Sequence, residues 1–148
     1  FSHRSDERNK EALQSVIGKR ELLTLRLQDV RYYHGDTALF SFGKKREYVL
    51  AYLEAFEVGS REVLRRRLGE RLIPVSREDA ENFTCNSLQI DTAEGPHLIF
   101  PQGVSDEVMK IVSDLGFSHT CVDVSEFFQK GGGSVKCLVC DVGPFVDQ

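Results

Sequence analysis

The sequence predicts an α/β fold made of repeated ββαβ modules. Two observations indicate this class: the order strand pair, helix, strand occurs twice, and similar short segments return at regular intervals. The chain has 148 residues, 41% of them hydrophobic, which is enough for one globular domain with a core. Two full domains are therefore not expected.

A helix and a strand precede the first complete module. The helix is predicted over residues 5–17, because Ser5 can cap it, apolar side chains recur on one face, and Gly18 can end it. Residues 22–27 are then expected to form a strand.

The first complete module begins with a strand pair over residues 37–42 and 47–53, joined through a turn at Gly43. A helix follows from Ser60 to a stop at Gly69, with Leu64 on its inner face. The three arginines at positions 65–67 are expected to form a solvated basic face of this helix. Residues 72–75 supply the closing strand.

The second module repeats this order. Its strand pair covers residues 87–90 and 97–100, its helix is capped by Ser105 and ended by Gly116, and its closing strand covers residues 119–124.

The ends of three predicted strands carry similar residue pairs. They are Leu27-Gln28, Val75-Ser76 and Val124-Ser125, separated by 48 residues (27 to 75) and 49 residues (75 to 124). Each pair begins a predicted loop of about eight to ten residues that leads to the next strand and carries polar groups. Because modules packed around a common axis bring equivalent positions together, we expect these three junctions to converge on one site.

Composition excludes several classes of partner. The formal net charge of −4 disfavours a nucleic-acid partner, and no apolar run approaches the roughly 20 residues of a membrane-spanning helix, so no direct membrane insertion is expected. Four cysteines do not make a disulfide framework and favour a reducing compartment, the cytoplasm or the mitochondrial matrix. One Cys-x-x-Cys without a histidine pair disfavours structural zinc.

Cys137 is the candidate nucleophile. It follows three glycines and Ser134, and glycines allow close approach of the backbone to a substrate and leave amides free to meet a developing negative charge. The alternative is a flexible glycine hinge followed by a small, buried strand residue. Cys140, three positions on, would point to the opposite face of a strand, so no dithiol redox pair is expected.

His34 is the candidate general acid and base, since imidazole titrates near neutral pH. Tyr32 and Tyr33 precede it and can shield the site. The Asp36 carboxylate can orient the imidazole or bind a cationic substrate group, although the same residues also fit an ordinary turn. Asn86, at the second junction, is a candidate to bind the substrate or a neighbouring loop.

These residues resemble the signatures of a known superfamily. His34-Gly35-Asp36-Thr37, followed about a hundred residues later by a Gly-Gly-Ser-x-x-Cys motif ending at Cys137, is similar to the motifs of the guanidine-modifying superfamily. That superfamily contains arginine deiminases, arginine dihydrolases, dimethylarginine dimethylaminohydrolases and amidinotransferases. The first motif is closer to deiminases and dihydrolases, whereas the ending from Cys137 to Val142 is similar to that of amidinotransferases.

The resemblance implies a five-fold pseudo-symmetric α/β propeller (pentein) of ββαβ modules with its site on the pseudo-axis. It further implies that Cys137 attacks the guanidinium carbon of arginine or a related compound, that His34 transfers protons, and that Asp36 holds the guanidinium nitrogens. No metal or organic cofactor is required by this chemistry.

The chain departs from the family pattern in size, because it holds only about three of five modules. Residues 1–148 are therefore expected to form the C-terminal part of a propeller that a second polypeptide completes, either a separately encoded half or the other product of a cleavage. This partner would supply further acidic residues for the substrate. The alternatives are an amidinotransferase and a catalytically inactive scaffold or binding subunit of a larger complex.

Overall fold

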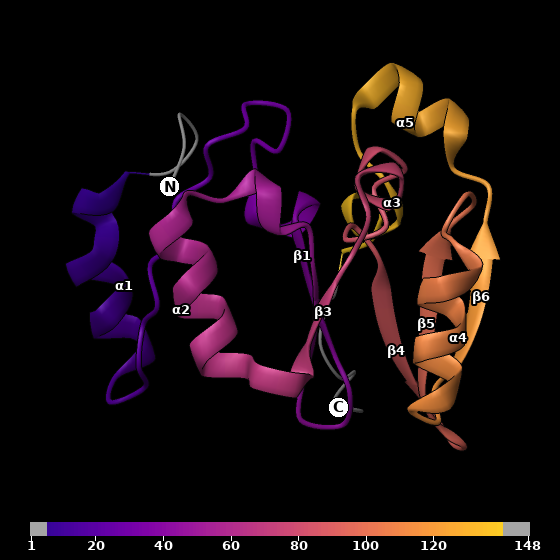
Figure 1. The fold of residues 1–148 in the computed structure, drawn as a ribbon, viewed down its shortest axis with the longest axis horizontal. Coiled ribbons are helices and arrows are strands. Elements are labelled where there is room, and N and C mark those ends of the chain that lie inside the picture. Colours follow the sequence, from indigo (N-terminus) through magenta and orange to yellow (C-terminus); the bar gives the residue numbers. More distant parts are fainter. Residues whose placement is uncertain (1–5, 141–148) are drawn as a thin grey trace, which may run out of the picture.

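The computed structural model describes residues 6–140, which form an α/β fold with two three-stranded sheets (Figure 1). In each sheet the first two strands are antiparallel, and the second pairs in parallel with the third. One helix precedes each third strand, so the predicted ββαβ order is confirmed twice. The strands are β1 (Leu39–Phe42), β2 (Tyr48–Ala51) and β3 (Leu72–Pro74) in the first sheet, and β4 (Leu88–Thr92), β5 (Gly95–Pro101) and β6 (Ser118–Val122) in the second.

The helices of the described chain are mostly short. The α-helices are α1 (Lys10–Ile17), α2 (Val58–Leu68), α3 (Arg77–Glu81), α4 (Asp106–Asp114) and α5 (Ser125–Gly131). The 3-10 turns are η1 (Glu7–Asn9), η2 (Gly35–Thr37), η3 (Leu53–Ala55), η4 (Gly69–Arg71) and η5 (Val135–Leu138). Within residues 6–140, no helix has the length and apolar character needed to cross a membrane.

Two predicted elements at the start of the chain differ from the structure. The first helix begins at Lys10 after a 3-10 turn, and its expected cap Ser5 lies outside the described residues. The strand predicted over residues 22–27 is wrong: only Leu27 pairs, in one isolated antiparallel bridge with Phe56. A strand requires a continuous neighbour, and the described chain places none along this segment.

The loops predicted after β3 and β6 are helices α3 and α5. Ser76 begins α3, and its hydroxyl accepts a hydrogen bond from the Asp79 amide, which is the usual cap for the first turn of a helix. At the equivalent point before α5, Asp123 accepts a hydrogen bond from the Ser125 amide. Both helices have fewer than eight residues, which is too short for a clear 3.6-residue pattern.

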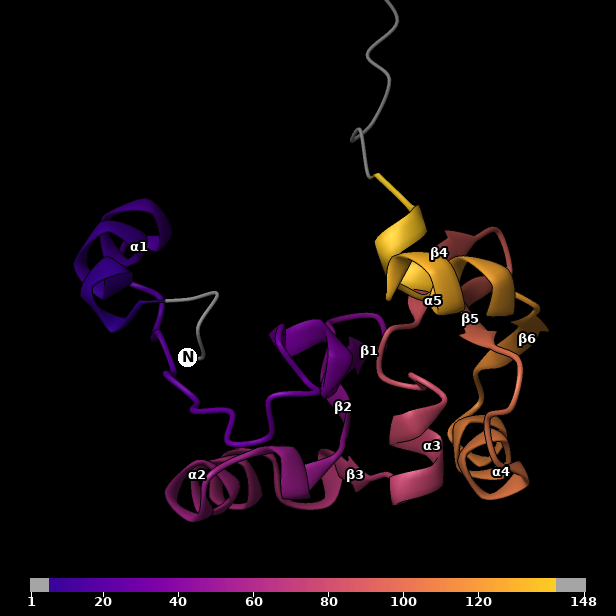
Figure 2. The same ribbon diagram turned by 90° about the horizontal axis from the view of Figure 1, so that it is seen from above.

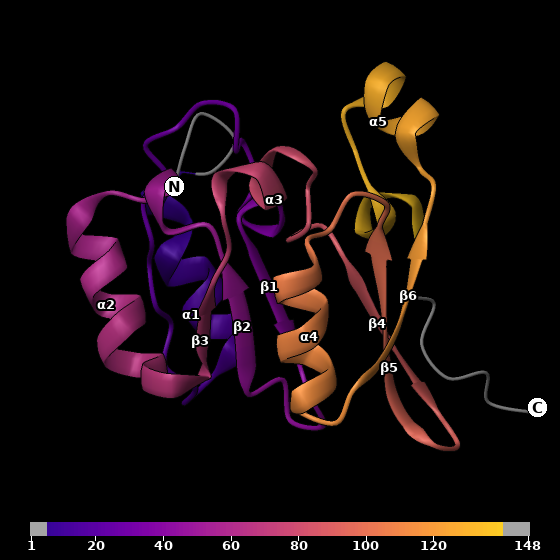
Figure 3. The ribbon, with the colours of Figure 1, turned by 45° about the vertical axis from the view of Figure 1, so that its right-hand side comes forward.

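The two modules share one hydrophobic core. Phe40 in β1 contacts Phe100 in β5 edge-on at 6.2 Å between ring centroids, and Phe42 contacts Phe117 at 5.3 Å. Between the modules, the buried Gln89 side chain accepts a hydrogen bond of 2.7 Å from the Gly43 amide. These contacts fix the orientation of one sheet relative to the other, as the side-by-side sheets in Figure 3 show.

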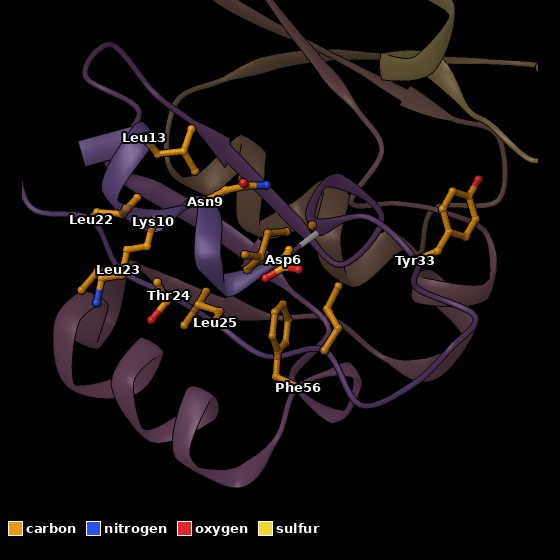
Figure 4. A pocket seen from close by; sticks show the side chains of 13 residues that line it. Asp6, Asn9, Lys10, Leu13, Leu22, Leu23, Thr24, Leu25, Tyr33 and Phe56 are labelled. Carbon is orange, nitrogen blue, oxygen red and sulfur yellow. The ribbon is translucent and has the colours of Figure 1, made fainter. Parts of the chain in front are cut away.

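The elements are arranged along an open arc when the molecule is seen from above (Figure 2). Helix α1 lies at one end, the first module in the middle and the second module at the other end. Helix α1 has no buried residue, and its Leu13 and Val16 side chains are 49% and 83% exposed. A pocket of about 370 Å³ separates it from the segment that contains Leu23 and Leu25 (Figure 4).

A buried carboxylate joins the starts of α3 and α4. Asp79 is 2% exposed, accepts a hydrogen bond of 2.8 Å from the Ser105 amide, and accepts two more from the Ser76 and Ser105 hydroxyls. Ser105 in turn caps α4, as the sequence predicted. One side chain therefore connects the α3 turn, which leads to Asn86, with the helix of the second module.

We expect Asp79→Ala to lower the free energy of unfolding by about 1–3 kcal/mol, because it removes the buried acceptor of three hydrogen bonds, from the Ser105 amide and from the Ser76 and Ser105 hydroxyls. Asp79→Asn keeps one acceptor oxygen and should lose less. Chemical denaturation measures both effects. Asp114→Ala is the control, because Asp114 forms an exposed pair with Lys110 that contributes under about 1 kcal/mol. Equal effects of Asp79→Ala and Asp114→Ala would contradict this role.

Burial raises the pKa of the Tyr32 hydroxyl and of the Cys85 thiol to about 12. Each group stays protonated in the folded chain at a pH where the unfolded chain has lost the proton. The stabilisation is complete below the unfolded pKa values and is lost as the pH rises toward 12. We expect the free energy of unfolding to fall over this range, and less steeply in Tyr32→Phe. An identical slope in wild type and variant would rule out this contribution.

Candidate functional site

The fully buried side chain of Asn86 joins the three predicted junctions. Its amide nitrogen donates to the carbonyl oxygen of Asp36 at 3.2 Å, and its amide oxygen accepts from the backbone amides of Ser134 at 3.1 Å and Cys137 at 3.3 Å. The Asn86 carbonyl oxygen also accepts from the Lys136 amide at 2.9 Å. The convergence predicted from the repeat is therefore confirmed, and Asn86 binds neighbouring loops; its role toward substrate stays a prediction.

Cys137 lies in the 3-10 turn η5, not in a strand, so the strand prediction is wrong here. The Cys137 amide donates to the Ser134 carbonyl at 3.0 Å, which closes the turn, and the neighbouring Lys136 amide donates to the Asn86 carbonyl. Both backbone amides are therefore already used and cannot pair with a neighbouring strand. Strand alternation therefore does not place the Cys140 side chain opposite that of Cys137. Both side chains are exposed and both thiols are free.

The Cys137 side chain packs directly over Gly133. A Cβ atom placed on Gly133 would lie 2.7 Å from the Cys137 Cβ and 3.3 Å from its Sγ. The thiol also lines a pocket of about 570 Å³ together with Phe127 of α5 and Leu138. Because Gly133 has no side chain, the Cys137 side chain can lie directly against it. The pocket gives the thiol access to solvent.

Three backbone amides around the thiol are already bonded. The prediction of free amides concerned the glycines before Ser134, of which Gly132 donates to the Phe128 carbonyl at 2.9 Å. The amides of Ser134, Lys136 and Cys137 all donate to Asn86. These three groups therefore cannot stabilise a developing oxyanion without breaking the bonds that hold the turn in place.

His34 is exposed and precedes the turn η2. Its carbonyl oxygen accepts hydrogen bonds from the amide and the hydroxyl of the buried Thr37, at 3.2 and 2.7 Å, so the backbone at His34 is fixed. The Tyr33 ring contacts the imidazole edge-on, with 4.9 Å between centroids. Tyr32 does not shield the site as predicted, because it is buried in the core against Tyr52.

The carboxylate of Asp36 is half-buried and lines a pocket of about 250 Å³ with Arg46 and Lys136. Its Oδ1 atom is buried and has no hydrogen-bond partner in the part of the chain that the structure describes. A buried carboxylate oxygen without a donor is costly, and a ligand that brings an N–H group would remove this cost.

The structure thus connects the predicted residues without placing all of them in one pocket. Asp36 and Cys137 are both bonded to Asn86 but line different pockets. The sequence did not indicate one hydrogen bond near the site: the Tyr33 hydroxyl donates to the Gly132 carbonyl at 2.7 Å, and the two residues are 99 positions apart. Among residues 6–140, no three His, Cys, Asp or Glu side chains gather to hold a metal ion.

Two of the relatives that this chain resembles are named for chemistry on arginine. It is 32% identical over 123 residues to the bifunctional arginine dihydrolase/ornithine cyclodeaminase AgrE of Nostoc, covering 82% of this chain and 16% of AgrE. It is 30% identical to the N(G),N(G)-dimethylarginine dimethylaminohydrolase of Mycobacterium tuberculosis, covering 97% of this chain and 44% of that protein. The chain therefore spans less than half of each relative.

Solved structures of related proteins are similar to this chain in fold. The crystal structure of AgrE with ornithine and NAD⁺ matches all of this chain and 21% of the AgrE chain, with a TM-score of 0.85 and 30% identity. The N-terminal domain of the cyanobacterial arginine dihydrolase ArgZ, covalently bound to a reaction intermediate, matches 93% of this chain and 48% of that chain, with a TM-score of 0.81 and 30% identity.

The family model described as N,N dimethylarginine dimethylhydrolase, eukaryotic, matches residues 1–143, almost the whole chain. The repeated ββαβ modules and the motifs at His34 and Cys137 agree with this match. The chain belongs to the eukaryotic N,N dimethylarginine dimethylhydrolase family, within the guanidine-modifying pentein superfamily.

Proposed function

We propose that this chain supplies the nucleophile, the general acid and base, and one substrate-binding carboxylate of a cysteine-dependent hydrolase that acts on the guanidino group of arginine or a related compound. The observation that carries the proposal is the buried Asp36 Oδ1 atom, which has no donor among the described residues. The Asn86 side chain bonds both the Asp36 backbone carbonyl and the Cys137 amide, so the segment that carries this carboxylate is attached to the turn that carries the thiol. A planar guanidinium offers N–H groups in the geometry that a carboxylate accepts.

The occupied amides of the Cys137 turn support a cationic substrate over an acyl compound. Attack on a carbonyl creates an oxyanion that needs free N–H donors, and the amides of Ser134, Lys136 and Cys137 are bonded to Asn86. Attack on a guanidinium carbon instead neutralises a positive charge and creates no oxyanion. Carboxylates such as Asp36, rather than amide donors, are then the groups that the substrate needs.

In the proposed mechanism, the Cys137 thiolate forms a bond to the guanidinium carbon, and His34 as imidazolium donates a proton to the departing amine as its C–N bond breaks. A covalent thiouronium remains on Cys137. His34, now neutral, takes a proton from water, whose oxygen attacks the same carbon, and the C–S bond breaks to restore the thiolate. The relatives are named as hydrolases, which favours water over a transferase amine as acceptor. One ArgZ structure holds a covalent reaction intermediate, which supports a covalent route.

We also propose that a second polypeptide completes the site with further carboxylates and the remaining modules of a five-fold propeller. The chain covers only 44% of the dimethylaminohydrolase relative, so most of that protein has no counterpart here. The unburied face of α1, with its exposed Leu13 and Val16, and the 41% exposed Ile90 on β4 are surfaces that further modules would cover.

We expect 2-chloroacetamidine to label Cys137 selectively in the native complex, with excess arginine slowing the reaction, as intact mass and peptide mapping would measure. His34→Ala and Asp36→Asn should each slow labelling by at least about 10-fold. The chain alone should lose the protection by arginine, because the partner's carboxylates are absent.

Cys121 and Cys140 are exposed internal controls, whereas the raised pKa of the buried Cys85 keeps it a thiol. Even labelling of Cys121, Cys137 and Cys140 in the complex, without protection by arginine, would instead favour a catalytically inactive scaffold.

Gly133→Ala should slow labelling of Cys137 by about 10-fold or more, because the added methyl group forces the thiol away from its position. Gly131→Ala is the matched control: it adds the same methyl group two residues earlier, where nothing lies within 4 Å. Equal labelling rates in the two variants would show that Gly133 does not set the position of the thiol.

A further inference from the structure

Tyr33 connects two segments that carry different parts of the proposed site. Its half-buried side chain donates a hydrogen bond of 2.7 Å to the carbonyl oxygen of Gly132. Gly132 ends helix α5 in the left-handed conformation, with φ +73°, and opens the turn that leads to Cys137. Tyr33 also lines the pocket beside α1, and Figure 4 shows its ring at the edge of that pocket, apart from Leu23 and Phe56.

The same tyrosine contacts His34. The two rings meet edge-on, with centroids 4.9 Å apart and planes at 62°. Thr37 fixes the His34 backbone, whereas the imidazole itself is exposed, so contact with the Tyr33 ring limits its orientation. One side chain therefore meets the imidazole with its ring and the nucleophile segment with its hydroxyl.

We propose that Tyr33 is a positioning residue that holds the His34 imidazole in register with the Cys137 thiol. This inference rests on the proposed function, in which His34 exchanges protons during attack by Cys137. Proton transfer requires heavy-atom distances of about 3 Å, and a displacement of about 1 Å can cost two orders of magnitude in rate. The Tyr33–Gly132 bond is placed to prevent such a displacement.

The role is separable from stability of the fold. Asn86 already ties the Asp36 segment to the Cys137 turn through three hydrogen bonds of its side chain. Loss of the Tyr33 hydroxyl therefore leaves the two segments attached, while the Gly132 end of the turn and the His34 imidazole lose their common contact.

The test compares Tyr33→Phe with wild type, His34→Ala and Tyr48→Phe in the native complex. Tyr48→Phe is a matched control, because Tyr48 is also half-buried but lies in β2 against Phe42 and Phe117. The first readout is the rate at which neutral chloroacetamide alkylates Cys137 across pH 5–10, which needs no guanidine recognition. The second is kcat and KM for arginine, or for dimethylarginine if that is the better substrate.

We expect Tyr33→Phe to shift the alkylation profile toward that of His34→Ala, and to lower kcat by about 10-fold with little change in KM. Tyr48→Phe should match wild type in both readouts. A Tyr33→Phe profile equal to wild type, while His34→Ala differs, would overturn the role of Tyr33 and leave the proposed function intact. Identical profiles for wild type and His34→Ala would overturn the proposed function, and the role of Tyr33 with it.

Discussion

The buried amide of Asn86 is the interaction on which the rest of the site depends. Water cannot reach it, so each of its hydrogen-bonding groups requires a partner within the protein, and those partners are the backbones of Asp36, Ser134 and Cys137. No charged group is needed to bring the three segments together. The price of this arrangement is that the amides beside the thiol are no longer available to a substrate.

Asn86 reaches its partners because the two modules have one fixed orientation. The rings of Phe40, Phe100 and Phe117 pack the two sheets together through the core. Near the start of β4, three residues after Asn86, the Gln89 side chain accepts a hydrogen bond from the Gly43 amide. Two amide side chains near the start of β4, those of Asn86 and Gln89, therefore connect the second module to the first. A site assembled from loops is in this way supported by residues next to and within one strand.

The repeat could be found in the sequence because each module uses the same strand and helix patterns and the same glycine stops. It correctly placed both sheets, α2, α4 with its Ser105 cap, and the convergence at Asn86. The helices α3 and α5 are too short for periodicity, and the turn at Cys137 depends on Asn86, about fifty positions away. The Tyr33–Gly132 hydrogen bond could not be predicted from the sequence, because the residues around Tyr33 do not indicate which distant carbonyl its hydroxyl will reach.

The side-chain bonds of Asn86 and Tyr33 that connect the site join distant parts of the chain, with separations of 48, 50, 51 and 99 residues. Closing such loops costs entropy before any contact is gained, and the core contacts Phe40–Phe100 and Phe42–Phe117 join segments just as distant. We therefore expect these bonds to form together with the shared core, which brings the same segments together. During synthesis the segment with His34 and Asp36 leaves the ribosome well before residues 132–137 exist. Until those residues are made, the Asn86 amide oxygen lacks the Ser134 and Cys137 amides that it accepts from in the folded chain, so these three segments can be connected only after the thiol has been synthesised.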